Sequence, residues 1–132
     1  MHIRPPPPLP LMRAAPPPLT ELWLYDQDGN SYQFHLSPSY WDPPEAIFAT
    51  YAFASATGQI GYIGKAKSLT DRQDGHEKRG PAWLHGYQHL YVHVPGVFAT
   101  YPYDEVERRL IKAISPPMNV QHNPLPGLFA AH

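Results

Sequence analysis

The sequence lacks cysteine altogether, which excludes a disulfide scaffold and a zinc site built on thiolates. It also lacks an apolar run of ~18 residues, the length that a membrane-spanning helix requires, so we expect no membrane partner. The first residues do not have the pattern of a signal peptide, because Arg4 is followed by four prolines instead of an apolar stretch. These absences together predict an intracellular, cytoplasmic protein.

An excess of charge of one sign is missing too. Ten Lys and Arg stand against eleven Asp and Glu, for a net charge of -1, and this balance is not the strongly basic footprint that nucleic-acid-binding proteins usually carry. Residues 46–122 nevertheless hold eight Lys and Arg against six Asp and Glu, so this part is mildly basic. We expect its intrinsic affinity for nucleic acid to be weak.

Proline, by contrast, is abundant and unevenly spread, with eight of the 18 prolines among the first 18 residues. Residues 1–19 are therefore predicted to form a disordered, polyproline-like tail. Arg4, Pro7 and Pro10 have the spacing of an SH3-type ligand. Any proline-rich string with a nearby Arg matches that pattern, so a semi-rigid leader is favoured over a protein partner of the tail. Residues 123–132 are predicted to be a second tail.

Residues 20–45 are predicted to form a β-hairpin and a linker. Two alternating runs, 22–25 and 32–36, flank a segment with turn chemistry. Asp26, Asp28 and Asn30 also resemble the first ligands of a calcium loop, but Ser37 stands where such a loop requires Glu. A plain turn is favoured.

Residues 46–122 are predicted to alternate strands with helices. Runs 46–54 and 60–63 indicate a second hairpin, and residues 89–94 indicate a further strand. The 132 residues allow one compact domain. We therefore expect an α+β fold: a small, mainly antiparallel β-sheet flanked by helices, with the first hairpin added at its N-terminal side.

Two helices are predicted within the same region. Ser68 and Asp71 form a capping box, so the first helix begins there and continues to the Gly-Pro pair at 80–81, with Gly75 as its weak point. Asp104 is the predicted cap of the second helix, which carries an apolar stripe and ends before the two prolines at 116–117. Arg72 and His76, four residues apart, would share one face of the first helix.

Several residue types in this region are used in phosphodiester chemistry. The segments GYIGKAKSLTDRQDGH and ERRLIKAISPPMN resemble the GIY-YIG nuclease domain, over residues 49–119. Gly64–Lys67 is similar to the excinuclease branch of that family, whereas His76 is similar to the homing and restriction branches. Ala49-Thr50-Tyr51 replaces the usual Gly-Ile-Tyr. The positions that match the family's pattern are Tyr51, Tyr62, Ile63, Gly64, Arg72, His76, Glu107 and Asn119.

The resemblance implies a metal-dependent DNA endonuclease, with Glu107 holding a hydrated Mg²⁺ or Mn²⁺. Arg72 would pair with the phosphate. Tyr51 would act as the general base or orient the attacking water, and as a base it needs a neighbouring cation, either Lys65, Arg72 or the metal, to lower its pKa. His76 would hydrogen-bond a tyrosine or share the proton.

The remaining matched positions have supporting roles in the same interpretation. Tyr62 would contact the phosphate or the metal's water shell. Gly64, where we expect the second strand to leave the sheet, would let the backbone approach closely and join Lys65 and Lys67 in substrate binding. Asn119 would tie the chain end to the core. A single site cuts one strand, so a double-strand break needs a homodimer or two visits.

Other interpretations of the sequence remain open. His85, His89 and His93 recur every fourth residue and could bind zinc on a continuous helix, but Gly86 and the strand pattern argue against that helix. The domain could be a noncatalytic nucleic-acid-binding module of the same fold, or a scaffold for the proline-rich tail. The sequence does not distinguish DNA from RNA, nor restriction, repair, a mobile element or attack on a competitor.

Overall fold

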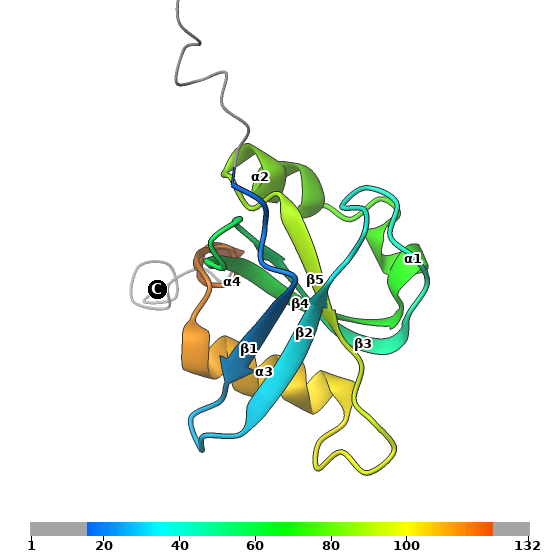
Figure 1. The fold of residues 1–132 in the computed structure, drawn as a ribbon, viewed down its shortest axis with the longest axis vertical. Coiled ribbons are helices and arrows are strands. Elements are labelled where there is room, and N and C mark those ends of the chain that lie inside the picture. The colour runs from blue at the N-terminus through cyan, green and yellow to red at the C-terminus, as the bar shows by residue number, and fades with distance from the viewer. Residues whose placement is uncertain (1–15, 123–132) are drawn as a thin grey trace, which may run out of the picture.

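The computed structural model describes residues 16–122 and contains five strands and four helices in that range (Figure 1). Most of the two predicted tails lies outside the described residues. No described helix is long and apolar enough to cross a membrane. In chain order the elements are β1 (Glu21–Tyr25), β2 (Ser31–Leu36), β3 (Ile47–Ala54), β4 (Ile60–Ser68), α1 (Leu69–Gln73), α2 (Arg79–Leu84), β5 (His89–His93), α3 (Tyr103–Ile114) and α4 (Pro117–His122).

The strands form one antiparallel sheet in the order β1-β2-β5-β3-β4, which confirms the predicted α+β class. β5 lies between the two hairpins and joins them, since it pairs with β2 on one side and β3 on the other. The first hairpin therefore extends the same sheet. Its strand β1 forms one edge of the sheet, and β4 forms the opposite edge.

The core lies on both faces of this sheet, because successive strand residues point to opposite faces. One face packs against α3 and buries Phe34, Ile63, Tyr91 and Leu110. The other face lies against α1, α2 and α4 and includes Tyr51, Phe53, Ala66, Leu69, Ala82, Leu90 and Met118. Two apolar layers of this kind hold the sheet between helices.

The predicted helix over residues 68–80 is wrong, although its start is confirmed. The Ser68 hydroxyl accepts a hydrogen bond from the Asp71 backbone N–H at 3.3 Å, as a capping residue does. However, α1 ends at Gln73, and Gly75 adopts a left-handed φ of 71° that turns the chain away. A separate helix, α2, then runs across Gly80-Pro81, since proline is tolerated in a first helical turn.

Two further boundaries differ from the prediction. β4 continues to Ser68, which pairs with Ile47, so the strand does not leave the sheet at Gly64. α3 is preceded by Pro102 as its N-cap, and Asp104 lies within the first turn. The end of α3 agrees with the prediction, because Ser115 closes it in a left-handed conformation. The following prolines then open α4.

The turn between β1 and β2 is fixed by Asp26. Its carboxylate accepts hydrogen bonds from the backbone N–H groups of Asp28 and Asn30, each at 2.9 Å, as an Asx turn does. The Tyr32 hydroxyl and the Arg109 guanidinium donate to the other carboxylate oxygen, at 2.8 and 2.9 Å. The plain turn favoured from the sequence is therefore also tied to α3.

Candidate active site

Tyr51 and His76 form the centre of the candidate site. Tyr51 lies on β3 with its side chain fully buried, and its Oη is 2.6 Å from Nε2 of His76. His76 is also buried, but it follows Gly75 in the loop after α1. The prediction that Arg72 and His76 share a helical face is therefore wrong. The predicted hydrogen bond between His76 and a tyrosine is present.

The hydrogen bonds of His76 define its protonation. The backbone N–H of Lys78 donates to Nδ1 at 3.0 Å, so Nδ1 carries no proton. Burial, together with the charges of Arg72, Arg79 and Lys78, lowers the pKa of His76 to about 3, so the imidazole is neutral near pH 7. A neutral imidazole with an unprotonated Nδ1 carries its proton on Nε2. His76 therefore donates its hydrogen bond to the Tyr51 oxygen.

Tyr51 is a neutral phenol in this structure. Burial raises its pKa above the ordinary value of 10, and the opposing charge of Arg72 does not outweigh that effect. The expected lowering of this pKa by a protein cation is therefore not observed. The buried amide of Gln73, which was not singled out from the sequence, lies close to the same hydroxyl. Its nitrogen and oxygen have no hydrogen-bond partner among residues 16–122.

Gly64 makes room for the Tyr51 ring. The two residues are register partners on β3 and β4, and a Cβ on Gly64 would lie 2.5 Å from Tyr51 Cζ. Any larger residue at position 64 would therefore overlap the phenol. Because glycine has no side chain, the Tyr51 ring can pack directly on β4.

Tyr62 extends the aromatic cluster toward the edge of the sheet. Its ring centroid lies 5.6 Å from that of His76 and 5.8 Å from that of Phe53, on which it stacks. Burial raises the pKa of Tyr62, the charge of Arg72 opposes this, and Glu107 adds to it. Tyr62 therefore lies next to His76 and within the electrostatic influence of Arg72 and Glu107, the two charged groups expected at the site.

A groove of about 450 Å³ lies along β4, and its lining includes Arg72, whose charge acts on Tyr51, Tyr62 and His76. It brings together Lys65, Lys67 and Arg72, the three cations expected to bind substrate. Arg72 forms no ion pair with any residue among 16–122. Tyr103, the first residue of α3, also lines the groove. Tyr103 was not predicted as a site residue, and the only signal in the sequence was its position four residues before Glu107, on the same helical face.

Glu107 is half-buried on α3 close to the cations. Burial raises its pKa, while the charges of Lys65 and Arg72 oppose that change and Asp104 supports it. Among residues 16–122 no three His, Asp or Glu side chains are placed to hold a metal ion together. One carboxylate close to a group of cations fits a hydrated Mg²⁺ or Mn²⁺, which keeps most of its waters, and does not fit zinc held by several side chains.

Asn119 has the structural position expected of it. Its side-chain amide accepts a hydrogen bond from the backbone N–H of Ile63 and donates one to the carbonyl of the same residue, both at 2.9 Å. Ile63 directly follows Tyr62 on β4. Asn119 therefore fixes the edge strand next to the candidate site.

The three histidines considered for zinc are not arranged on one helix. His85 caps the end of α2, whereas His89 and His93 lie on β5. The ring of His93 donates from Nδ1 to the Gln33 carbonyl at 2.8 Å and packs on Phe34. Its surroundings are those of a strand residue joining β5 to β2.

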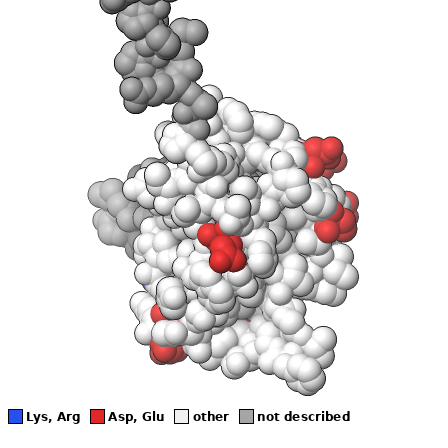
Figure 2. All heavy atoms as spheres, viewed as in Figure 1, with Lys and Arg blue, Asp and Glu red and all other residues white. Residues whose placement is uncertain are grey.

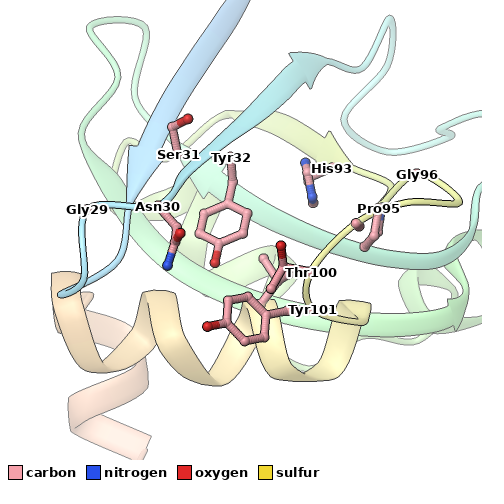
Figure 3. A pocket seen from close by; sticks show the side chains of 11 residues that line it. Gly29, Asn30, Ser31, Tyr32, His93, Pro95, Gly96, Thr100 and Tyr101 are labelled. Carbon is pink, nitrogen blue, oxygen red and sulfur yellow. The ribbon is translucent and has the colours of Figure 1, made fainter.

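A second hollow, of about 430 Å³, lies between the β1–β2 turn, the end of β5 and the start of α3 (Figure 3). Its lining includes Asn30, Tyr32, His93, Thr100 and Tyr101, and none of the predicted site residues. The face of the molecule that carries β1 and β2 shows scattered acidic side chains and almost no basic surface (Figure 2). The cations that line the β4 groove are therefore not part of this face.

Comparison with protein-family models, with curated proteins and with solved structures found no match for this chain.

Proposed function

We propose that this chain is a metal-dependent endonuclease of the GIY-YIG type that hydrolyses DNA phosphodiester bonds at the β4 edge. The observation that carries the proposal is the buried Tyr51–His76 hydrogen bond of 2.6 Å, together with Arg72, whose charge acts on both groups and which lines a groove with Lys65 and Lys67. Burial of a phenol and an imidazole costs free energy that an apolar pair of the same shape would not cost. The charge of Arg72, which lines the groove, acts on both groups and supports a chemical use for the pair.

The charges and protonation states suggest a role for each group. Arg72 would bind the nonbridging phosphate oxygens, for which a guanidinium has matching geometry. Tyr51, neutral and held by His76, would orient the attacking water through its hydroxyl, which requires the buried hydroxyl to become accessible when DNA binds. Should Tyr51 ionise during the reaction, the His76 hydrogen bond would stabilise the phenolate. Glu107 would hold Mg²⁺ or Mn²⁺, which when bound neutralises phosphate charge and makes coordinated water more acidic.

The test is the cleavage of supercoiled plasmid and of branched DNA by the purified full chain with Mg²⁺, with Mn²⁺ or with EDTA. We expect metal-dependent nicking that is lost in Glu107→Ala and in Tyr51→Phe. Trp23→Ala, a change at the opposite edge of the sheet, serves as the matched control and should keep the wild-type rate. The ratio of nicked to linear product reports whether one strand or both strands are cut.

Binding of the same DNAs, recorded in parallel, separates this proposal from its alternatives. Tight binding without cutting in any metal would favour a noncatalytic nucleic-acid-binding module. The absence of both binding and cutting would favour a protein partner of the proline-rich tail, and deletion of residues 1–18 would then test that partner. Either result would overturn the endonuclease proposal.

A further inference from the structure

Phe48 combines two unfavourable features near the groove. It lies in β3 with a left-handed φ of 51°, a conformation that costs a residue with a bulky side chain. Its side chain is also 52% exposed, although it is large and apolar. Strained, exposed residues that a fold retains are often found at binding sites. Packing within the described residues does not account for both features.

The ring of Phe48 has one clear aromatic neighbour, Tyr103, with the ring centroids 5.5 Å apart. Tyr103 is anchored by its carbonyl, which accepts a hydrogen bond of 2.7 Å from the Thr50 hydroxyl. The register of β3 with β4 pairs Ile47 with Ser68 and Ala49 with Ala66, which places Phe48 opposite Lys67. Tyr103 lines the cationic groove and Phe48 packs on Tyr103, so the two rings form an aromatic wall beside the groove.

This aromatic wall is close to the proposed metal ligand. Tyr103 and Glu107 are four residues apart on α3, so they lie on one face and are separated by one turn, ~6 Å of helix rise. That separation corresponds to about one or two nucleotides of a strand. A strand whose phosphate lies near Glu107 would thus place a neighbouring base at the two rings.

We propose that Phe48 and Tyr103 form a stacking platform for an unpaired nucleobase, so that the protein binds DNA with a single-stranded gap in preference to a continuous duplex. The inference rests on the groove being the nucleic-acid site of the proposed function. A base inside a duplex is already stacked and cannot reach the platform, whereas an unpaired base can. The cations of the groove hold the phosphates of both DNAs, and the rings distinguish between them.

The test compares the affinity of the full chain for two DNAs in EDTA, by fluorescence anisotropy. One is a continuous duplex, and the other is a duplex with a short single-stranded gap and the same number of phosphates. We expect the wild-type protein to prefer the gapped DNA. Phe48→Ala should weaken binding to the gapped DNA by about tenfold, within the range measured for base stacking on aromatic side chains, and leave duplex binding nearly unchanged.

Two control variants separate stacking from charge and from general effects. Lys67→Gln should weaken binding to both DNAs by the same factor, because it removes a phosphate contact. Trp23→Ala, which removes an aromatic side chain of similar exposure (49%) at the opposite edge, should change neither. Phe48→Leu keeps an apolar side chain but no ring, and it provides the second test if the Ala variant fails to fold.

The inference is overturned if the wild-type protein has no preference for the gap, or if the folded Phe48 variants weaken both DNAs equally or neither. These results are distinguishable from failure of the endonuclease proposal, because binding in EDTA requires no cleavage. Cutting of plasmid without gap preference would keep the endonuclease and reject the platform. Gap preference that depends on Phe48, without cutting, would keep the platform and reject the endonuclease.

Discussion

Replacement of Gly64 by alanine tests the central packing of the candidate site. The new Cβ would lie 2.5 Å from Tyr51 Cζ, whereas an ordinary carbon contact is ~3.5–4 Å. The Tyr51 ring must then shift by about 1 Å, yet it is fully buried and bonded to His76. Overpacking of this kind typically costs about 1–3 kcal/mol of the free energy of unfolding. A displacement of ~1 Å at a catalytic group costs on the order of 10²-fold in rate.

Gly61→Ala on the same strand provides the matched control. There the Cβ would lie 2.6 Å from Cε2 of Tyr87, a half-buried ring that does not belong to the site. Urea melts measure the stability of both variants, and plasmid nicking measures their rates, corrected for the folded fraction. We expect both to be destabilised and only Gly64→Ala to lose cleavage. Wild-type stability and rate in Gly64→Ala would refute the packing of Tyr51 over β4.

Three further substitutions test the neighbouring contacts. Asn119→Ala leaves the backbone N–H and carbonyl of Ile63 without their hydrogen-bond partners. We expect the free energy of unfolding to fall by about 2–4 kcal/mol, measured by urea melts. An unchanged midpoint of the urea melt would contradict this prediction. Glu107→Gln should raise the Tm at pH 7 without metal, because a carboxyl whose pKa is raised by burial destabilises the folded state once it ionises. This gain in Tm should vanish near pH 4, where the carboxyl is protonated. A Tm of the variant below that of the wild type at pH 7 would contradict the prediction. His76 stays neutral in the folded protein but takes up a proton near pH 6.5 in the unfolded chain. The free energy of unfolding should therefore fall by about 2 kcal/mol from pH 7 to pH 5. Melts of His76→Gln at the two pH values should show that most of this pH dependence is lost.

The strands could be predicted from the sequence because their signal is local. Alternating side chains between 22 and 36 gave the first hairpin, and the apolar runs after residue 46 gave the second. The length of β4 could not be obtained in this way, since its lysines break the apolar pattern. Pairing with the long strand β3 extends β4 to Ser68, and tertiary contacts outweigh local preference there.

The site could be predicted only in part, for a similar reason. His76 lies beside a tyrosine as predicted, but it lies in the loop after α1 and not on the same helix as Arg72. Gly75 turns the chain after α1 and so directs His76 inward. In the sequence, this glycine was the one indication that the helix ends before His76. Phe48 and Tyr103 are 55 positions apart in sequence and meet only through the packing of α3 on β3. The residue pattern of a strand also gives no indication that Phe48 adopts a left-handed φ.

Lys65 and Lys67 have a second explanation to be weighed, because charged side chains on an edge strand prevent pairing with other molecules. The opposite edge provides the comparison. β1 carries no lysine and exposes Trp23 and Tyr25 instead. If the fold needed lysines to protect its edges, β1 would need them as much as β4. Since both lysines line the groove with Arg72, and Lys65 acts on the pKa of Glu107, the proposed role in binding phosphate accounts for their position better than edge protection does.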